Sequence, residues 1–183
     1  MLKRIREASP SFKARVAGGI FLFVILTAAF TQFFLRGRLG FAADLSAGFI
    51  EVSGVIAVTL LFYEIFKAVN RSLSWLAASF NFLALTLELL QWIPRGVFIG
   101  IGFHALYCFL IGYLIFKSNF LPRILGALMA LAGLCWLVFL SPTLTNYLSP
   151  YHLALGLLGE ASVSLWLLAM GVNVQRWRQQ AGE

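Results

Sequence analysis

Six apolar segments, each about twenty residues long, constrain the fold of this chain more than any other feature. A helix needs about 20 mostly apolar residues to cross the ~30 Å hydrocarbon core of a bilayer. The chain is 61% hydrophobic and only 11% charged, whereas average soluble domains are about 45–50% apolar and about 25% charged. The sequence therefore predicts an all-α, polytopic membrane protein built as a six-transmembrane-helix bundle. The predicted spans are 16–35, 45–66, 73–93, 96–116, 121–140 and 150–171.

Short connections rich in glycine, proline and basic residues separate these segments. They leave no room for a soluble domain, so we expect one transmembrane domain over 16–171. It is flanked by a basic N-terminal tail, 1–15, and by a C-terminal tail, 172–183. The first apolar segment is too long for the core of a typical signal peptide, and no clear cleavage site follows it. We therefore expect it to persist as the first span.

Basic residues are divided unevenly between the two ends of the predicted bundle. The positive-inside rule assigns the richer end to the cytoplasm, so both termini are predicted to be cytoplasmic. The net charge of +7 is then explained by topology and anionic lipid, and no basic face suitable for nucleic acid exists. The richer end has Lys3, Arg4, Arg6, Lys13, Arg15, Lys67, Arg71, Lys117, Arg123, Arg176 and Arg178, and the other end has Arg36, Arg38 and Arg95.

Ionisable residues inside the apolar segments are the candidates for function. A carboxylate in hydrocarbon costs roughly 2.5–3.5 kcal/mol on insertion scales, so it usually faces a bundle interior. At 1.5 Å of rise per residue, the four selected positions lie about 8–15 Å below the predicted outer ends of their helices. We expect them to line one ligand-binding site in the outer half of the bundle. These residues are Glu51, Glu88, His104 and Glu160.

Other polar residues in the spans are given structural roles. Glu64 lies one turn from a cytoplasmic helix end and is expected to pair with Lys67, three residues later. His152 lies near the outer surface. For each candidate site residue, a purely structural hydrogen bond to a neighbouring helix remains an alternative. The cysteines, Cys108 and Cys135, are expected to be small buried side chains without a disulfide.

Two segments carry small and polar residues at every fourth position. Such ridges let membrane helices approach closely, and we expect both to face a shared interior together with Asn81 and Glu88 of the third span. The first ridge is Gly96, Gly100, His104, Cys108 and Gly112, and the second is His152, Gly156, Glu160 and Ser164.

Three stretches, 69–80, 112–126 and 159–173, together resemble a bacterial family of small multi-helix membrane proteins catalogued as a domain of unknown function. The most specific parts are the turn around Leu121-Pro122-Arg123 and the segment that begins with Gly159-Glu160. The resemblance spans nearly the whole chain, and it implies a multi-pass protein of the bacterial inner (plasma) membrane with six helices. It transfers no activity and no catalytic residues. The chain departs from the family pattern at Asn81, where a basic residue is favoured.

No motif identifies a reaction, and whether the protein is an enzyme is left open. The main hypothesis is a non-enzymatic membrane protein whose buried Glu/His cavity binds a small solute, a lipid or a partner subunit. The alternative is a proton-coupled carrier or an intramembrane, metal-dependent enzyme that uses the same residues. Besides membrane lipids, the expected partners are a small solute or a partner membrane subunit. A homo-oligomer and a purely structural accessory subunit are both left open.

Cofactors are not expected. Two histidines and several glutamates match the ligand types of catalytic zinc, but no His-x-x-x-His or His-Glu-x-x-His spacing is present. Haem ligation by both histidines is also disfavoured, because His104 and His152 lie at different predicted depths. The sequence therefore predicts no metal site and no cofactor.

Overall fold

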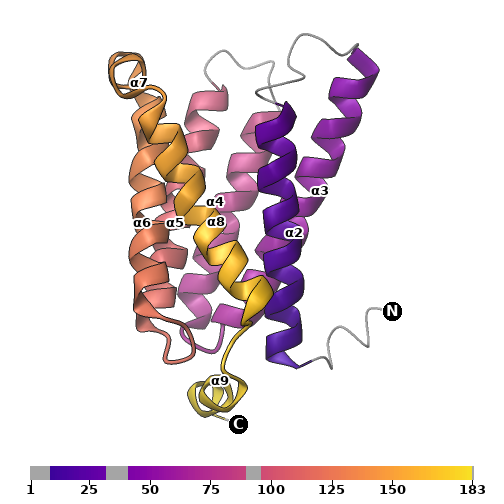
Figure 1. Cartoon of the computed structure of the whole chain (residues 1–183), viewed down its shortest axis with the longest axis vertical. Coiled ribbons are helices and arrows are strands. Elements are labelled where there is room, and N and C mark those ends of the chain that lie inside the picture. Colours follow the sequence, from indigo (N-terminus) through magenta and orange to yellow (C-terminus); the bar gives the residue numbers. More distant parts are fainter. Residues whose placement is uncertain (1–8, 32–40, 90–95, 183) are drawn as a thin grey trace.

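The computed structural model describes residues 9–31, 41–89 and 96–182. Within these ranges the chain is helical without strands, and six helices are long and apolar enough to cross a membrane. This confirms the predicted all-α, six-span fold class (Figure 1). The elements are α2 (Pro10–Phe30), α3 (Phe41–Phe66), α4 (Arg71–Leu89), α5 (Gly96–Lys117), α6 (Arg123–Leu137), the 3₁₀ helix η2 (Val138–Leu140), α7 (Pro142–Leu148), α8 (Tyr151–Ala169) and α9 (Val174–Ala181).

The first helix begins at Pro10, six residues before the predicted start of the first span. Ser9 caps it, because its hydroxyl oxygen accepts the backbone N–H of Phe12 at 3.2 Å. Pro10 occupies the first helical turn, where its missing N–H costs nothing. Two short helices, α7 and α9, also form where the sequence suggested only a loop and a tail.

Some predicted features lie outside the described residues. These are the predicted ends of the first and third spans, at 35 and 93, most of the N-terminal tail, and the loop residues Arg36, Arg38 and Arg95.

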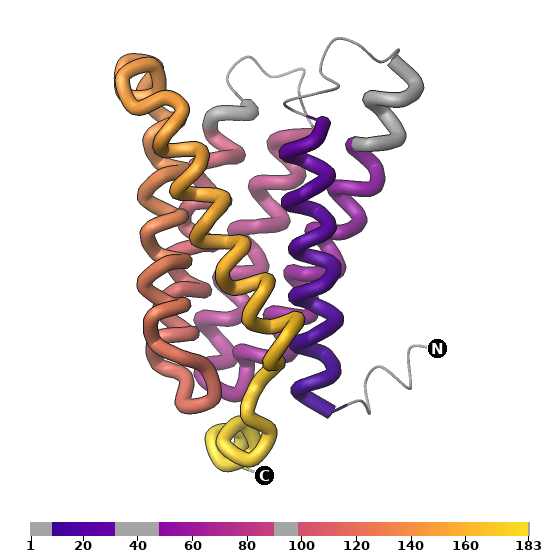
Figure 2. The backbone as a smooth tube through the Cα atoms, viewed as in Figure 1, coloured from indigo at the N-terminus to yellow at the C-terminus, as the bar shows by residue number. Residues whose placement is uncertain are grey.

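The six long helices form a ring. Each packs mainly against two neighbours, in the order α2, α3, α4, α5, α6, α8 and back to α2. In Figure 1, α8 runs obliquely from α6 to α2 and so closes the ring. Figure 2 shows α9 and the start of α2 at one end of the bundle and α7 at the opposite end. Polar side chains that point inward therefore face the interior of this ring.

Glycines allow the helices on either side of α6 to approach it closely. A Cβ atom on Gly112 of α5 would lie 2.8 Å from the carbonyl oxygen of Gly126 on α6, and the reverse substitution would place a Cβ 2.6 Å from the Gly112 oxygen. Gly159 of α8 is equally confined, since its Cβ would lie 2.5 Å from the Leu128 oxygen. Small residues permit such backbone contacts between membrane helices. The residue directly after Gly159 is Glu160, so this contact sets how far Glu160 stands from α6.

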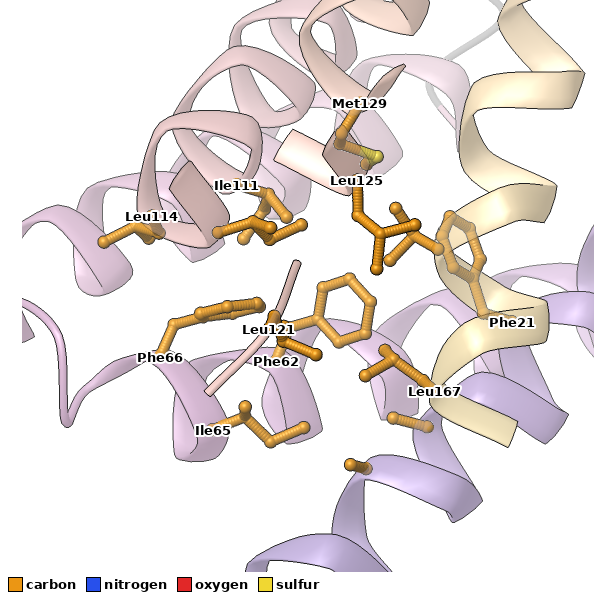
Figure 3. Close-up of a cluster of buried hydrophobic side chains, with 14 of the residues drawn as sticks. Phe21, Phe62, Ile65, Phe66, Ile111, Leu114, Leu121, Leu125, Met129 and Leu167 are labelled. Carbon is orange, nitrogen blue, oxygen red and sulfur yellow. The ribbon is translucent and has the colours of Figure 1, made fainter. Parts of the chain in front are cut away.

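An apolar cluster fills the ring toward the α9 end (Figure 3). Its side chains come mainly from α2, the last turns of α3, the second half of α5, the segment 120–129 and the last turns of α8. Phe62 makes edge-to-face contacts with Phe21 and Phe66, with ring centroids 5.8 Å and 5.7 Å apart. Such pairs contribute about 0.5–1.5 kcal/mol beyond the area they bury. The cluster leaves the middle of the ring to the polar residues described below.

The last helix, α9, is docked on this same end. Gly171 has a φ of 67° and ends α8, which allows the chain to turn toward α9. The indole of Trp177 then donates its N–H to the carbonyl oxygen of Ile65 at 2.8 Å. Gln180 accepts the backbone N–H of Asn119 and donates to the carbonyl oxygen of Lys117. The C-terminal segment is thus tied to the ends of α3 and α5.

Glu64 forms the pair predicted for it and takes no part in the polar interior. Its carboxylate lies 2.9 Å from the ammonium of Lys67 and 3.5 Å from that of Lys13 on α2. The pair bridges α2 and α3 near the α9 end of the bundle.

Candidate functional site

A network of hydrogen bonds crosses the interior of the ring between α3, α4, α5, α6 and α8. The network lies near the middle of the bundle along the helix axes, because Glu160 is at the midpoint of α8. Its members are Thr59, Asn81, His104, Cys108, Trp136 and Glu160.

The backbone carbonyl of Val55 fixes which groups donate and which accept in the series of hydrogen bonds from Thr59 through Asn81 to His104. The Thr59 hydroxyl donates its hydrogen to the carbonyl oxygen of Val55, one turn earlier, at 2.7 Å. Thr59 can then only accept, so the amide nitrogen of Asn81 donates to it at 2.7 Å. This orients the Asn81 oxygen toward Nδ1 of His104, 3.0 Å away, and it accepts the Nδ1–H there. His104 therefore carries a hydrogen on Nδ1, and its Nε2 faces the opposite way.

Nε2 of His104 lies 3.0 Å from Oε1 of Glu160. The same oxygen accepts the indole N–H of Trp136 at 2.7 Å, and an indole can only donate. A contact of 3.0 Å between Nε2 and Oε1 requires one proton between them. The pair is therefore either an imidazolium with a carboxylate or an imidazole with a carboxylic acid. Its net charge is zero in both cases.

This neutrality explains how the pair is tolerated in an apolar bundle. Glu160 is 4% exposed and Asn81 is 2% exposed. A buried charge without a partner is strongly destabilising, whereas a hydrogen-bonded, neutral pair avoids most of that cost. Each network member that donates a hydrogen bond donates it to an acceptor on another helix, apart from Thr59, which donates within its own helix. The network consequently links the helices as well as satisfying its own polar groups.

A cavity of about 190 Å³ adjoins the network on one side. It is smaller than the ~300–1,000 Å³ pockets that hold drug-sized ligands, so only a small molecule fits. The side chain of His104 is 23% exposed and that of Glu160 only 5%, so the imidazole is the member of the pair that faces the cavity. The cavity is lined by Val55, Asn81, Ala84, Leu85, Glu88, Ile101, His104 and Trp136.

The four residues predicted to form the site are not all equivalent in the structure. His104 and Glu160 are in direct contact, and Glu88 lines the cavity beside His104. Glu51 lies one helical turn before Val55, which is part of the cavity wall. Glu51 is close enough to Glu88 for the two side chains to interact electrostatically. Its Oε1 is buried and has no hydrogen-bond partner among the described residues. That these residues bind a ligand remains a prediction.

His152 does not join this group. Its imidazole packs edge-on against Phe139, with 4.8 Å between ring centroids. Phe139 in turn stacks on Trp136, whose ring contacts His104. Two aromatic rings thus separate the histidines in this series of contacts, which gives no support to haem ligation by both.

Four network members were not among the predicted site residues: Thr59, Asn81, Cys108 and Trp136. Asn81 was predicted only to face the shared interior. Cys108 did carry a signal, because it lies four residues after His104 on the same helix face. Thr59 and Trp136 carried none. A threonine inside a span is common, and nothing in the sequence near Trp136 indicates that its N–H reaches another helix.

One group of atoms in the described part of the chain has the composition of a metal site. Nε2 of His104, the sulfur of Cys108 and a carboxylate oxygen of Glu160 all lie within 4.8 Å of one another. Both cysteines of the chain are buried and free.

Residues 83–171 match the family described as Domain of unknown function (DUF4386). This confirms the predicted resemblance to a family of unknown function, although the stretch 69–80 lies outside the matched range. The range includes His104, Cys108, Trp136 and Glu160, whereas Thr59 and Asn81 precede it. No curated protein matches the chain, and no solved structure matches it.

Proposed function

We propose that the protein is a non-enzymatic membrane protein that binds a small organic cation in the cavity between α3, α4, α5 and α6. The observation that carries this proposal is Glu88, whose carboxylate lines the cavity without a hydrogen-bond partner among the described residues. Glu160 is already used by His104 and Trp136. Among the residues that line the cavity, Glu88 is therefore the acidic group that remains for a ligand.

The other walls of the cavity suit the same class of ligand. Trp136 presents an aromatic ring, and cations are attracted to the faces of such rings by about 0.5–2 kcal/mol. Val55, Leu85 and Ile101 supply apolar surface for alkyl groups. Glu51 lies near Glu88 and is a second acidic side chain on this side of the bundle. A small alkylammonium ion would thus meet a carboxylate, an aromatic ring and apolar walls together. With both termini in the cytoplasm, this cavity lies in the outer half of the bundle.

Binding of tetramethylammonium to the purified protein in lipid nanodiscs tests the proposal by calorimetry. Tert-butanol is the uncharged probe of similar size. We expect the cation to bind and the alcohol to bind at least tenfold more weakly, because only the cation interacts with Glu88. Glu88→Gln keeps the shape of the side chain and should weaken cation binding at least tenfold.

Glu64→Gln is the matched control, because it removes a carboxylate at the other end of the bundle. It should leave cation binding unchanged. Equal binding of the two probes, or full binding by Glu88→Gln, would contradict the proposal.

The proton held between His104 and Glu160 favours a proton-coupled carrier as the second candidate. That proton lies next to the cavity and needs only a small movement to leave its partner. Proteoliposomes with an imposed pH gradient would then accumulate labelled tetramethylammonium, and Glu160→Gln should abolish the accumulation. A protein that only binds the cation shows no gradient-driven uptake in the same vesicles.

A further inference from the structure

We infer that His104, Cys108 and Glu160 together bind a divalent transition metal ion of the zinc class. This inference goes beyond the proposed cation site, since it uses Nε2, a thiolate and Oε1 rather than Glu88. It also departs from the expectation of no metal drawn from the sequence. Two of the ligands, His104 and Cys108, are on α5, and the third, Glu160, is on α8. Glu160 follows them by 56 and 52 residues in the sequence, so the three do not form a compact sequence motif.

The distances among the three donor atoms match a tetrahedral ion. The Cys108 sulfur lies 3.6 Å from Nε2 of His104 and 3.6 Å from Oε1 of Glu160, and these two atoms are 3.0 Å apart. Tetrahedral zinc has bonds of about 2.0–2.1 Å to nitrogen and oxygen and about 2.3 Å to sulfur. It therefore separates sulfur from a nitrogen or oxygen ligand by about 3.6 Å, and nitrogen from oxygen by about 3.3 Å. Only the Nε2–Oε1 separation must open, by a few tenths of an ångström, when the hydrogen bond is replaced.

The neighbours of the triangle hold its ligands in metal-binding orientations. A histidine that binds a metal through one nitrogen usually donates the other N–H to a fixed acceptor, and this arrangement sets its tautomer. His104 does so, because its Nδ1–H is held by Asn81. The indole of Trp136 holds Oε1 of Glu160 in the same way and leaves a second lone pair on that oxygen.

Binding also conserves charge in the bundle interior. Without metal, the His104–Glu160 pair carries one proton and Cys108 carries its thiol proton, so the three side chains sum to zero charge. A metal ion of charge 2+ displaces both protons and leaves a neutral imidazole, a thiolate and a carboxylate. The sum is again zero. The site therefore exchanges one divalent ion for two protons with no net charge left in the apolar interior, where a net charge would be costly.

Tyr107 supplies an independent observation beside this triangle. It is 2% exposed, its hydroxyl has no hydrogen-bond partner among the described residues, and its ring centroid lies 5.7 Å from that of His104. Buried polar atoms without a partner are rare and call for an explanation. A zinc ion with three protein ligands keeps a fourth position for water. A water in that position would provide a partner that the protein alone does not offer to Tyr107.

The test uses Zn²⁺ and Co²⁺ added to metal-free protein in lipid nanodiscs. We expect stoichiometric binding of both ions, a sulfur-to-cobalt charge-transfer absorption band, and release of two protons per ion in weakly buffered solution. Cys108→Ser should abolish the band. Cys135→Ser removes the other buried cysteine, on α6, and should leave both the band and the affinity unchanged. Failure of the wild-type protein to bind either ion, or equal loss of the band in both cysteine variants, would overturn the inference.

Two further variants keep the test decisive. Trp136→Phe retains the aromatic ring but removes the N–H that orients Glu160, so the metal affinity should fall about 10–100-fold while the protein stays folded. An unchanged affinity in this variant would contradict the assigned role of Glu160. Glu88→Gln should bind Co²⁺ normally, so failure of the metal site and failure of the organic-cation site are observed separately.

Discussion

At the scale of single residues, the most consequential side chain is Asn81. Asn81 is almost completely buried. Its two hydrogen bonds nevertheless determine which nitrogen of His104 is protonated. This order of donors and acceptors is set by Thr59, whose hydroxyl hydrogen is donated to the Val55 carbonyl oxygen. A buried hydrogen-bond network of this kind destabilises the fold if one member is missing, and it favours a single arrangement of the core if every member is present.

The tautomer of His104 tests this chain of hydrogen bonds. The sequence has two histidines, so His152→Gln leaves one imidazole to observe by ¹⁵N magnetic resonance. We expect Nδ1 of His104 to be protonated whenever the protein is folded. Thr59→Val removes the acceptor that fixes the Asn81 amide, and both neutral tautomers should then be populated.

Ser74→Ala is the control for that change. It also removes a buried hydroxyl from the bundle, but one that has no hydrogen-bond partner among the described residues. It should leave the His104 signals unchanged. A wild-type spectrum with an unprotonated Nδ1 would show that the order of donors and acceptors is wrong.

At the scale of the elements, α6 determines whether the site exists. It contacts α5 and α8 through the backbone at Gly112, Gly126 and Gly159. These contacts bring α8 close enough for Glu160 to reach His104, although α5 and α8 are not neighbours in the ring. A larger separation at either seam would lengthen the bond between the two side chains.

Gly112→Ala tests the α5–α6 seam. The added methyl group would lie 2.8 Å from the Gly126 oxygen, so α5 and α6 must move apart. Such overpacking costs typically about 1–3 kcal/mol, and the melting temperature in detergent should fall accordingly.

Gly48→Ala provides the comparison, because no atom of the described part of the chain lies within 4 Å of the Cβ it would add. It should be neutral or stabilising by up to about 1 kcal/mol, as expected from helix propensity alone. Equal melting temperatures for the two variants would show that the seam is not tightly packed.

At the scale of the whole molecule, the ring is polar inside at mid-height and apolar outside. Large hydrophobic side chains face outward on several helices, among them Phe23, Leu134 and Leu165, each more than half exposed. In water such a surface would cause aggregation, whereas lipid covers it without cost. Together with six spanning helices, this surface identifies a multi-pass membrane protein. The inner membrane as its location and the cytoplasmic placement of both termini remain predictions.

Single added cysteines test that orientation. The two variants are Asn146→Cys and Gln179→Cys. Asn146 is on α7 and Gln179 is on α9, at the opposite end of the bundle, and both residues are exposed. The native cysteines are buried and should react slowly. In intact cells, an impermeant maleimide should label Cys at 146 only, while broken cells should allow labelling of both. The reverse pattern would place the termini outside.

The spans themselves were predictable because hydrocarbon imposes one requirement on every segment, namely enough apolar residues to cross it with all backbone groups bonded internally. Glu64 was assigned correctly to Lys67 for a similar reason, since both lie on one helix three residues apart. The start of α2 was not predicted, because hydropathy identifies only the apolar part of a helix and ignores polar residues that continue it. Pro10 and the cap at Ser9 were the available signals for it.

What the sequence by itself determined is the number of spans, the all-helical class and the list of residues too polar to face lipid. These follow from local composition and from helix periodicity. Only the tertiary structure decided which of those residues meet. Glu160 contacts His104 and Trp136, while Glu51 remains at the side of the cavity, because the ring order of the helices and the glycine contacts of α6 set distances that no single helix encodes. The inferred metal site depends on the same fact: its three ligands are brought within bonding distance of one ion by packing between helices.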